Sequence, residues 1–260
     1  MPAEWRLIIE DPQSGAWNMA VDRAIQVARE EDRVPATLRL YMWSEPTVTL
    51  GRFQDASSID WSACRNLGVS VVRRFTGGRG VLHDDEITYS LVASESDGVP
   101  SGISASYRYL CRGLVAAYRR LGIEAELTER PRGSAGSAAC YLRTTRADLT
   151  VASAKLAGSA QTWLGKTCLQ HGSFTVARDV ARESEVFCLS PNEREELSKT
   201  TATLRDLLDD LPTRDRITHE IAVGIGEGLG IELKVGELTA EEARHAESLL
   251  VGVNVEAPSG

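Results

Sequence analysis

Residues Arg73–Asp84 read RRFTGGRGVLHD and lie between a β-like run and a second apolar segment. Glycine has no side chain, so Gly77 and Gly78 let the backbone adopt positive φ and approach a ligand closely. The guanidinium groups of Arg73 and Arg74 can donate paired hydrogen bonds to phosphate or carboxyl oxygens. The stretch therefore predicts a loop that binds an anion or an activated acyl group. A tight hairpin between two strands is the alternative, because adjacent glycines are common in such turns.

Two nucleotide-binding motifs do not fit this loop. No Lys-Ser or Lys-Thr pair follows at the spacing of a P-loop, and a strand rather than a helix follows the glycines, unlike a Rossmann fingerprint. His83 and Asp84 are neighbours in the sequence, but adjacent residues on a strand point to opposite faces. We therefore expect a structural His83 rather than half of a catalytic dyad.

The segments on either side of the loop show helix and strand periodicities. Residues 14–35 and 105–123 repeat apolar side chains every three or four positions, which predicts two amphipathic helices. Alternating or β-branched runs predict strands at residues 36–44, 46–53, 69–75, 87–94, 125–130, 147–163 and 168–177. In the 87–94 strand, one face is expected to carry Ile87, Tyr89, Leu91 and Ala93.

The pattern changes to helices from Glu193 onward. Helices are predicted at residues 198–208, 214–230 and 239–250, with a strand-like run at 231–238. Runs of strands followed by runs of helices predict an α+β fold. We expect residues 1–190 to form a sheet domain and residues 191–260 to form a small, mostly helical part packed on it.

Composition and charge narrow the classes of function. The 260 residues are 42% hydrophobic and 25% charged, which is typical of a globular protein. No segment approaches the roughly 18 to 20 apolar residues of a membrane span, and the N-terminus lacks a signal-peptide pattern, so we expect a cytoplasmic protein without a membrane partner. The net charge of −8 argues against non-specific nucleic-acid binding. An acidic partner would need a local concentration of arginines, for which the candidates are Arg73, Arg74, Arg79, Arg132, Arg143 and Arg146.

The cysteines are widely spread, with no CxxC pair and no spacing typical of a zinc site. This pattern predicts neither a disulfide framework nor a structural metal. Cys140 ends a small-residue loop fifteen positions before Lys155, whereas the other four have no companion motif and are interpreted as structural: Cys64, Cys111, Cys168 and Cys188.

Lys155 lies in AKLAGSAQ, a segment otherwise made mostly of small or apolar residues. An isolated lysine in such a segment either extends to solvent from a hairpin or serves a buried anion. An ammonium aimed at a carbonyl oxygen stabilises the negative charge that develops there, an effect worth roughly 10² to 10³ in rate. A thiol beside it is shifted toward the thiolate, so Cys140 and Lys155 would form an acyl-transfer centre if the fold brings them together.

Seven segments occur in a recognisable order: NMAVD at 18–22, LRLYMW and LGRFQ within 38–54, RRFTGGRGVLHD, ITYSL, KLAGSAQ and LQHGSF. Together they resemble the biotin/lipoate protein ligase superfamily over about residues 5–180, and especially the cysteine-dependent octanoyltransferases related to lipoate-protein ligase A. The resemblance implies an α+β fold in which a mixed curved sheet is flanked by helices. It also implies that residues 1–190 are the acyltransferase or ligase-like catalytic domain.

The resemblance implies roles for individual residues as well. Lys155 is expected to contact the acyl carbonyl, and Cys140 falls where the octanoyltransferases carry their nucleophile. The residues expected to bind the substrate are Arg73, Arg74, Thr76, Gly77, Gly78, His83, Gly158, Ser159, Ala160, His171 and Gly172. This sequence departs from the family's usual Pro-Ser and Tyr-Glu residues at Thr144, Thr145, Ala147 and Asp148.

The favoured function is octanoyl transfer, without a cofactor, from octanoyl-acyl carrier protein through Cys140 to a lysine of a lipoyl domain or of the glycine-cleavage H protein. The alternative is an ATP-dependent lipoate ligase, which would use ATP and Mg²⁺ and would leave Cys140 as a bystander. A third possibility is octanoyl transfer between two lipoyl-domain proteins through the same cysteine. A fourth possibility, from a different class, is a non-catalytic protein that binds an acyl carrier or a lipoyl domain without turnover.

Overall fold

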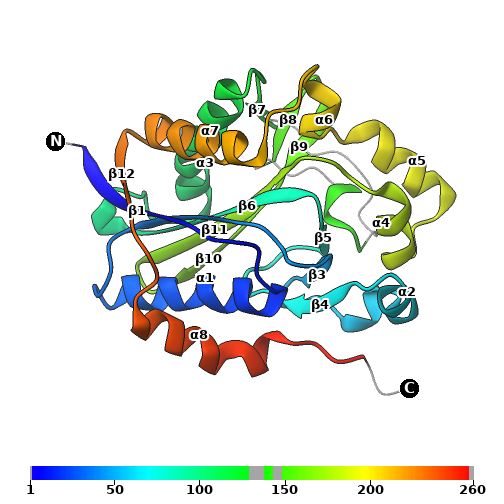
Figure 1. Ribbon diagram of the computed structural model, residues 1–260, viewed down its shortest axis with the longest axis horizontal. Helices are drawn as coiled ribbons and strands as arrows, with labels where there is room; N and C mark the ends of the chain where they lie inside the picture. The colour runs from blue at the N-terminus through cyan, green and yellow to red at the C-terminus, as the bar shows by residue number, and fades with distance from the viewer. Residues whose placement is uncertain (1, 129–137, 143–147, 258–260) are drawn as a thin grey trace.

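A six-stranded mixed sheet forms the centre of the computed structural model, which describes residues 2–128, 138–142 and 148–257 (Figure 1). Its strands are β1 (Ala3–Ile9), β2 (Thr37–Tyr41), β6 (Glu86–Ser94), β10 (Ser159–Leu164), β11 (Thr167–Thr175) and β12 (Ile231–Val235). Their order is β10-β11-β6-β2-β1-β12. Strands β12, β1 and β2 are parallel, and the remaining neighbours pair antiparallel. The expected α+β fold with a mixed sheet is confirmed.

Helices cover both faces of this sheet. Figure 1 shows α1 (Gly15–Glu30) and α8 (Ala240–Val253) on one face, and α3 (Ile103–Arg120) and α7 (Arg214–Leu229) on the other. Alternate side chains of β6 pack in the hydrophobic cluster that contains α3 and α7, whereas Val92 packs in the cluster that contains α1. The predicted face of β6 is thereby confirmed, and it comprises Ile87, Tyr89, Leu91 and Ala93.

Two small sheets and several short helices complete the fold. The first sheet contains β3 (Thr47–Leu50), β4 (Ser70–Arg73) and β5 (Val81–His83), and the second contains β7 (Glu126–Leu127), β8 (Leu149–Val151) and β9 (Ala154–Ala157). The short helices are α2 (Trp61–Asn66), α4 (Val180–Val186), α5 (Pro191–Thr200) and α6 (Leu204–Leu207). The glycine-rich stretch, residues 74–80, connects β4 to β5 and is called the glycine loop below.

Several elements differ from the prediction. Sequence analysis missed β1, because its central residues are buried on both faces and so show no alternation of apolar and polar side chains. The single helix predicted at 198–208 is instead split, with α5 ending at Thr200 and α6 beginning at Leu204. The break occurs where Thr201 forms a β-bridge with Lys155 and the Ala202 amide donates to the Lys155 carbonyl oxygen at 2.9 Å. The predicted strand at 125–130 is observed only at β7, and its last two residues lie outside the described residues.

Residues 191–260 are mostly helical and also contribute to the main sheet. β12 pairs in parallel with β1 at the edge of that sheet, and α8 packs along α1. α7 packs against α3 and contributes Ile217, Ile221 and Ile225 to the same hydrophobic cluster as the main sheet. The C-terminal part therefore shares the core formed by the preceding residues.

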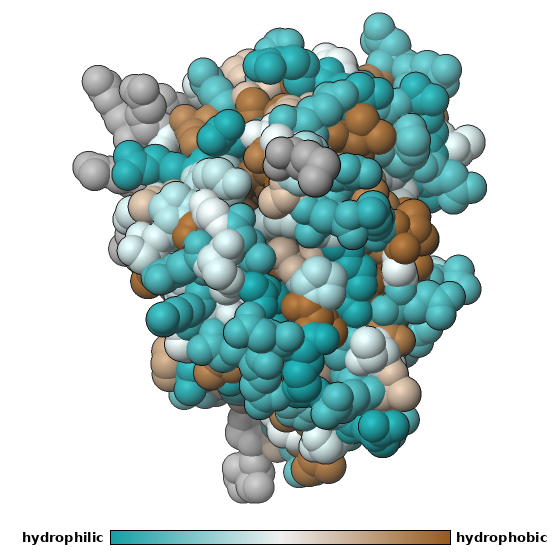
Figure 2. Space-filling view, turned by 90° about the vertical axis from the view of Figure 1, so that its left-hand side faces the viewer, coloured by the Kyte–Doolittle hydropathy of each residue, from teal (hydrophilic) through white to brown (hydrophobic). Residues whose placement is uncertain are grey.

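The surface at the β1–β12 edge is mainly hydrophilic, with separate hydrophobic patches (Figure 2). The charged residues Glu232 and Lys234 are exposed on β12, an arrangement that hinders pairing with another strand. Within residues 2–128, 138–142 and 148–257, no helix is long and apolar enough to cross a membrane.

Candidate active site

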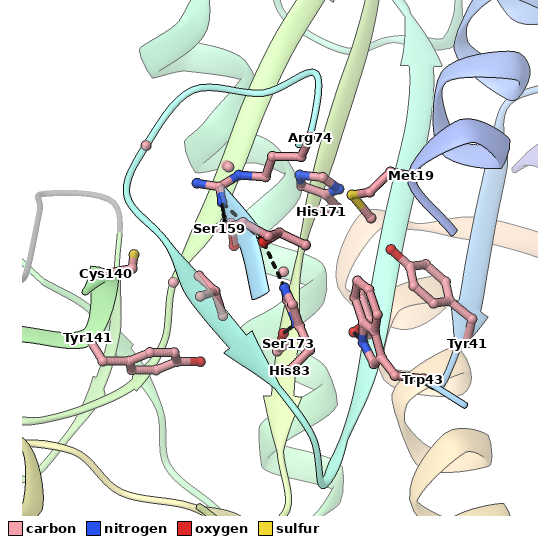
Figure 3. A pocket seen from close by; sticks show the side chains of 17 residues that line it. Met19, Tyr41, Trp43, Arg74, His83, Cys140, Tyr141, Ser159, His171 and Ser173 are labelled. Carbon is pink, nitrogen blue, oxygen red and sulfur yellow. Dashed lines mark hydrogen bonds between the residues drawn. The ribbon is translucent and has the colours of Figure 1, made fainter. Parts of the chain in front are cut away.

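A cavity lies between the glycine loop and the strands β10 and β11 (Figure 3). Figure 3 shows Cys140 and Tyr141 on one side of it and Met19, Tyr41 and Trp43 on the other. Its lining residues are Met19, Tyr41, Trp43, Thr49, Arg74, Gly78, Val81, His83, Thr88, Cys140, Tyr141, Gly158, Ser159, Ala160, His171, Gly172 and Ser173. The fold thus brings together many of the residues that the sequence analysis selected.

Cys140 lines this cavity, and Lys155 lies behind it. Cys140 begins a short 3-10 turn, and its amide donates to the Gly80 carbonyl oxygen at 2.9 Å, which ties the turn to the glycine loop. Lys155 lies on β9 with only 1% of its surface exposed. Its Nζ donates to the Cys140 carbonyl oxygen at 3.0 Å and lies 3.9 Å from Cys140 Sγ. The lysine is therefore buried behind the thiol and does not extend to solvent.

The surroundings of Lys155 keep it charged. Burial by itself lowers the pKa of Lys155, but the nearby Cys140, Asp148 and Tyr141 outweigh burial and raise the pKa above its usual value. The Asp148 carboxylate lies 3.1 Å from Nζ and the Tyr141 ring centroid lies 5.2 Å from it. The cation can therefore stabilise a thiolate or an oxyanion at Cys140.

Arg74 is a second buried cation in the cavity wall. Its Nε donates to Thr76 Oγ1, its Nη1 donates to the carbonyl and hydroxyl oxygens of Thr49, and its Nη2 donates to the carbonyl oxygens of Gly77 and Arg79. All five N–H groups thus donate to neutral oxygens of the protein. Burial lowers the pKa of Arg74 to about 10, an effect that the nearby Cys140 opposes. Arg74 therefore remains protonated at neutral pH and adds positive potential beside the thiol.

Arg74 also orders His171, which lines the cavity. Thr76 Oγ1 accepts a hydrogen bond from Arg74 and lies 2.8 Å from His171 Nε2, and His171 Nδ1 lies 3.1 Å from Asp22 Oδ2. Because the carboxylate can only accept, Nδ1 carries the proton and Nε2 accepts from the threonine hydroxyl. Burial lowers the pKa of His171, although Asp22 opposes this effect. The Nε2 lone pair is occupied, so His171 offers no free base to the cavity.

His83 has the same arrangement on the other side of Arg74. Its Nε2 lies 2.9 Å from Thr49 Oγ1, which accepts from Arg74, and its Nδ1 lies 2.7 Å from Glu86 Oε1. The ring stacks on Trp43 with centroids 4.1 Å apart. Asp84 instead pairs with Arg182, so the prediction that His83 and Asp84 form no dyad is confirmed. The carboxylate that pairs with His83 is instead that of Glu86, three residues further along the chain.

Three of the expected substrate-binding residues do not line the cavity. Arg73 turns away, and its Nη1 donates to the carbonyl oxygens of Gly51 and Gln54 at 2.8 and 2.7 Å, so it holds a neighbouring loop in place. Thr76 is fully buried between Arg74 and His171, where it connects the two. Gly77 contributes its carbonyl oxygen to Arg74 and leaves Gly78 to face the cavity. The structure therefore does not place Arg73, Thr76 and Gly77 in the cavity lining, because adjacent loop residues point in different directions.

Close neighbouring atoms leave little room for a side chain at two glycines of the site, Gly158 and Gly172. A Cβ atom on Gly172 would lie 2.6 Å from the Gly158 carbonyl oxygen, and one on Gly158 would lie 3.1 Å from Asp148 Oδ1. The absence of a side chain on Gly172 lets β11 approach Gly158, the residue between β9 and β10. The predicted residues Ser159 and Ala160 line the cavity beside them, and Tyr89 Oη contacts Ser159 Oγ at 2.5 Å.

Several buried polar residues support the site although their roles were not predicted from the sequence. Asp22 on α1 contacts His171, Arg39 and Tyr41, and Glu86 on β6 contacts His83 and Ser173. The sequence signal was present in α1, where the polar Asn18 and Asp22 lie four residues apart among apolar residues and therefore share the buried face. Contacts between these carboxylates and residues far away in the chain could not be read from that spacing.

Asp148 and Arg178 also act close to Cys140. Asp148 pairs with Lys155. Arg178 lies 3.7 Å from the centroid of the ring of Tyr141, the residue that directly follows Cys140. Arg178 also pairs with the buried Glu183. Of the four cysteines interpreted as structural, Cys64, Cys111 and Cys168 are buried, whereas Cys188 is exposed. The candidate residues Arg132, Arg143 and Arg146, together with Thr144, Thr145 and Ala147, lie outside the described residues.

Comparison with known proteins identifies related sequences. The family model described as lipoyl protein ligase A/B catalytic domain matches residues 14–223. Octanoyltransferase LipM of Kyrpidia tusciae is 41% identical over 95% of this chain and 94% of that protein. Octanoyltransferase LipM of Geobacillus kaustophilus is 36% identical over 94% of this chain and 93% of that protein.

Solved structures share the fold. A crystal structure of lipoate-protein ligase A bound with ATP has a TM-score of 0.79 and 25% sequence identity, and the match covers 95% of this chain and 94% of that chain. A protein from T. acidophilum solved with bound lipoic acid also has a TM-score of 0.79, with 24% identity over 96% of this chain and 95% of that chain.

Proposed function

Because this chain belongs to the lipoyl protein ligase A/B catalytic domain family, we propose that it is an octanoyltransferase that modifies lipoyl-domain proteins through an acyl-enzyme on Cys140. The single observation that carries the mechanism is the 3.9 Å separation of Cys140 Sγ from the buried ammonium of Lys155. The matches to the LipM octanoyltransferases cover nearly all of this chain and of those proteins, which supports octanoyl transfer as the type of reaction.

The first step is acylation of the cysteine. The Cys140 thiolate attacks the carbonyl carbon of an octanoyl thioester, and the carbon–sulfur bond of the donor breaks as the new thioester forms. The donor leaves as a thiolate and takes up a proton. Lys155 Nζ stabilises the attacking sulfur, and the same cation can stabilise the oxyanion of the tetrahedral intermediate.

The second step passes the acyl group to an amine. A neutral lysine amine of the acceptor attacks the Cys140 thioester, an amide bond forms and the Cys140 thiolate leaves. The proton lost by the amine balances the proton taken up by the donor thiolate in the first step, and Cys140 returns to the thiolate form in which the cycle began. His83 and His171 have their Nε2 atoms occupied by threonine hydroxyls, so electrostatic stabilisation by Lys155 and Arg74 carries the chemistry on the enzyme side.

The cavity suits an aliphatic chain. Opposite Cys140, its wall is formed by Met19, Tyr41 and Trp43 (Figure 3). Apolar and aromatic side chains favour a saturated acyl tail over a charged group. We therefore place the octanoyl carbonyl beside Cys140 and its methyl end toward Trp43.

The donor and acceptor are part of this proposal. An octanoyl-acyl carrier protein supplies the thioester, and a lipoyl domain or the glycine-cleavage H protein supplies the lysine. No cofactor is required. In the alternative, ATP-dependent ligation, a phosphate would have to bind near the glycine loop, yet every N–H of Arg74 already donates to a protein oxygen. This saturation favours the transferase.

A paired assay tests the function. Purified protein and a lipoyl domain are incubated with octanoyl-acyl carrier protein in one tube and with octanoate, ATP and Mg²⁺ in the other, and both are analysed by intact mass. We expect modification in the first tube only, with one octanoyl group on the enzyme when the lipoyl domain is omitted. A Cys140→Ser variant should abolish both signals. Modification only in the second tube, or undiminished transfer by Cys140→Ser, would reject the mechanism.

A further inference from the structure

An exposed aromatic residue lies beside exposed and half-buried arginines next to the cavity. Phe53 is 85% exposed, and the Arg52 guanidinium carbon lies 5.2 Å from the centroid of its ring. Arg23 on α1 is half-buried and lies over Phe75. We call the surface formed by Arg23, Arg52, Phe53 and Arg73 the basic rim. Large exposed aromatic side chains beside arginine are typical of protein-binding surfaces.

No ion pair involves the arginines of the basic rim within the described part of the chain. Within the described residues, Arg23, Arg52 and Arg73 lie within 4.0 Å of no carboxylate oxygen. Hydrogen bonding to Ser57 lowers the pKa of Asp55, and the charge of Arg73, which is beyond ion-pair distance, adds to this effect. Arg73 Nη1 lies 3.4 Å from the Arg52 carbonyl oxygen, which joins these two arginines in space. Burial lowers the pKa of Arg23, and the charge of Arg52 lowers it further. The rim thus concentrates positive charge in a chain whose net charge is −8.

The basic rim is continuous with the entrance to the cavity. The Arg52 amide donates to the Thr76 carbonyl oxygen at 2.9 Å. A Cβ atom on Gly51 would lie 1.9 Å from the Gly78 carbonyl oxygen, so the two backbones touch where Gly78 faces the cavity. Gln54 Nε2 donates to the Ala138 carbonyl oxygen at 3.3 Å, two residues before Cys140.

We propose that the basic rim is the docking surface for an acidic carrier domain, which there delivers its octanoyl thioester to Cys140. The inference rests on the proposed function and names the surface that recognises the donor. An acidic domain is repelled by the negative charge of the rest of the molecule and attracted to the unpaired arginines, so charge directs it to the cavity entrance. Phe53 supplies the apolar contact at the centre of this surface.

The test compares two donors that share the reacting group. Octanoyl-acyl carrier protein needs the docking surface, whereas octanoyl-pantetheine carries the same thioester without a protein. Acylation of Cys140 is followed by intact mass in the full-length protein carrying Arg52→Glu or Phe53→Ala. Arg52→Lys preserves the charge, and Arg194→Glu on α5 reverses another exposed arginine that is in no ion pair among the described residues.

We expect Arg52→Glu to lower kcat/KM for the carrier donor at least about tenfold at low salt, with a smaller effect at about 0.3 M salt because of screening. Phe53→Ala should lower it at both salt concentrations. Octanoyl-pantetheine should acylate every variant within about twofold of the unmodified rate, and Arg52→Lys and Arg194→Glu should resemble the unmodified protein with both donors.

Three results would overturn the docking proposal: unchanged acylation of Arg52→Glu by the carrier donor, an equal loss with both donors, or a loss confined to transfer onto the lipoyl domain. The last would assign the rim to the acceptor. Failure of the proposed function is distinct, because then neither donor acylates Cys140 in the unmodified protein.

Discussion

Removal of the Lys155 charge should slow acylation of Cys140 by a factor that the geometry fixes. Two unit charges separated by the 3.9 Å between Nζ and Sγ interact by about 4 kcal/mol at an effective dielectric constant of about 20. At about 1.4 kcal/mol per factor of ten, this corresponds to about 10³ in rate. Loss of one oxyanion-stabilising donor typically costs about 10² to 10³. We therefore expect a decrease of about 10² to 10³.

The variant must remove two charges together. Lys155→Met alone would break the buried ion pair with Asp148 and retain the Asp148 charge, and breaking such a pair costs about 3 to 5 kcal/mol of folding stability. The double variant Lys155→Met with Asp148→Asn removes both charges and keeps similar side-chain volumes. Asp148→Asn alone is the matched control, because it retains the ammonium beside Cys140.

Single-turnover acylation by octanoyl-pantetheine, followed by intact mass, provides the measurement. All proteins carry Cys188→Ser, because Cys188 is exposed and could be acylated non-specifically. Thermal unfolding confirms that each variant is folded. A folded double variant whose acylation rate falls less than tenfold would refute the electrostatic role assigned to Lys155.

Two further predictions concern the glycine loop and pH. Gly51→Ala should lower the free energy of unfolding by about 1 to 3 kcal/mol because its Cβ would strike the Gly78 carbonyl oxygen, whereas Gly77→Ala should be tolerated because its Cβ meets nothing within 4 Å. Urea unfolding measures both, and equal losses would contradict the packing. Because the pKa of His171 is lowered on folding, its contribution to the free energy of unfolding is present above about pH 6.5 and declines as pH falls below that value. The pKa of Asp22 is also lowered, so a further loss of stability follows below about pH 4. His171→Asn should remove the decline between about pH 6.5 and 5 in urea titrations, and an unchanged pH profile would contradict it.

The sequence was sufficient to predict those helices and strands whose apolar residues repeat at a regular spacing. The alternation of Ile87, Tyr89 and Leu91 assigned one face of β6 to the core, because successive side chains of a strand point to opposite sides. The three-and-four spacing in residues 105–123 likewise located α3. β1 was not predicted because a strand buried on both faces shows no alternation of apolar and polar residues.

The sequence by itself determined which residue types the site would contain: a glycine loop, a cysteine after a small-residue segment and a lysine among apolar neighbours. Only the tertiary structure decided how they combine. It placed Lys155 Nζ 3.9 Å from Cys140 Sγ, and it turned Arg74 into the cavity wall and the adjacent Arg73 toward the neighbouring loop. It also joined Asp22 to His171 across 149 positions of the chain. Local periodicity shows only which face of its own helix or strand a side chain occupies. The contacts of the site depend instead on how separate strands and loops pack against one another.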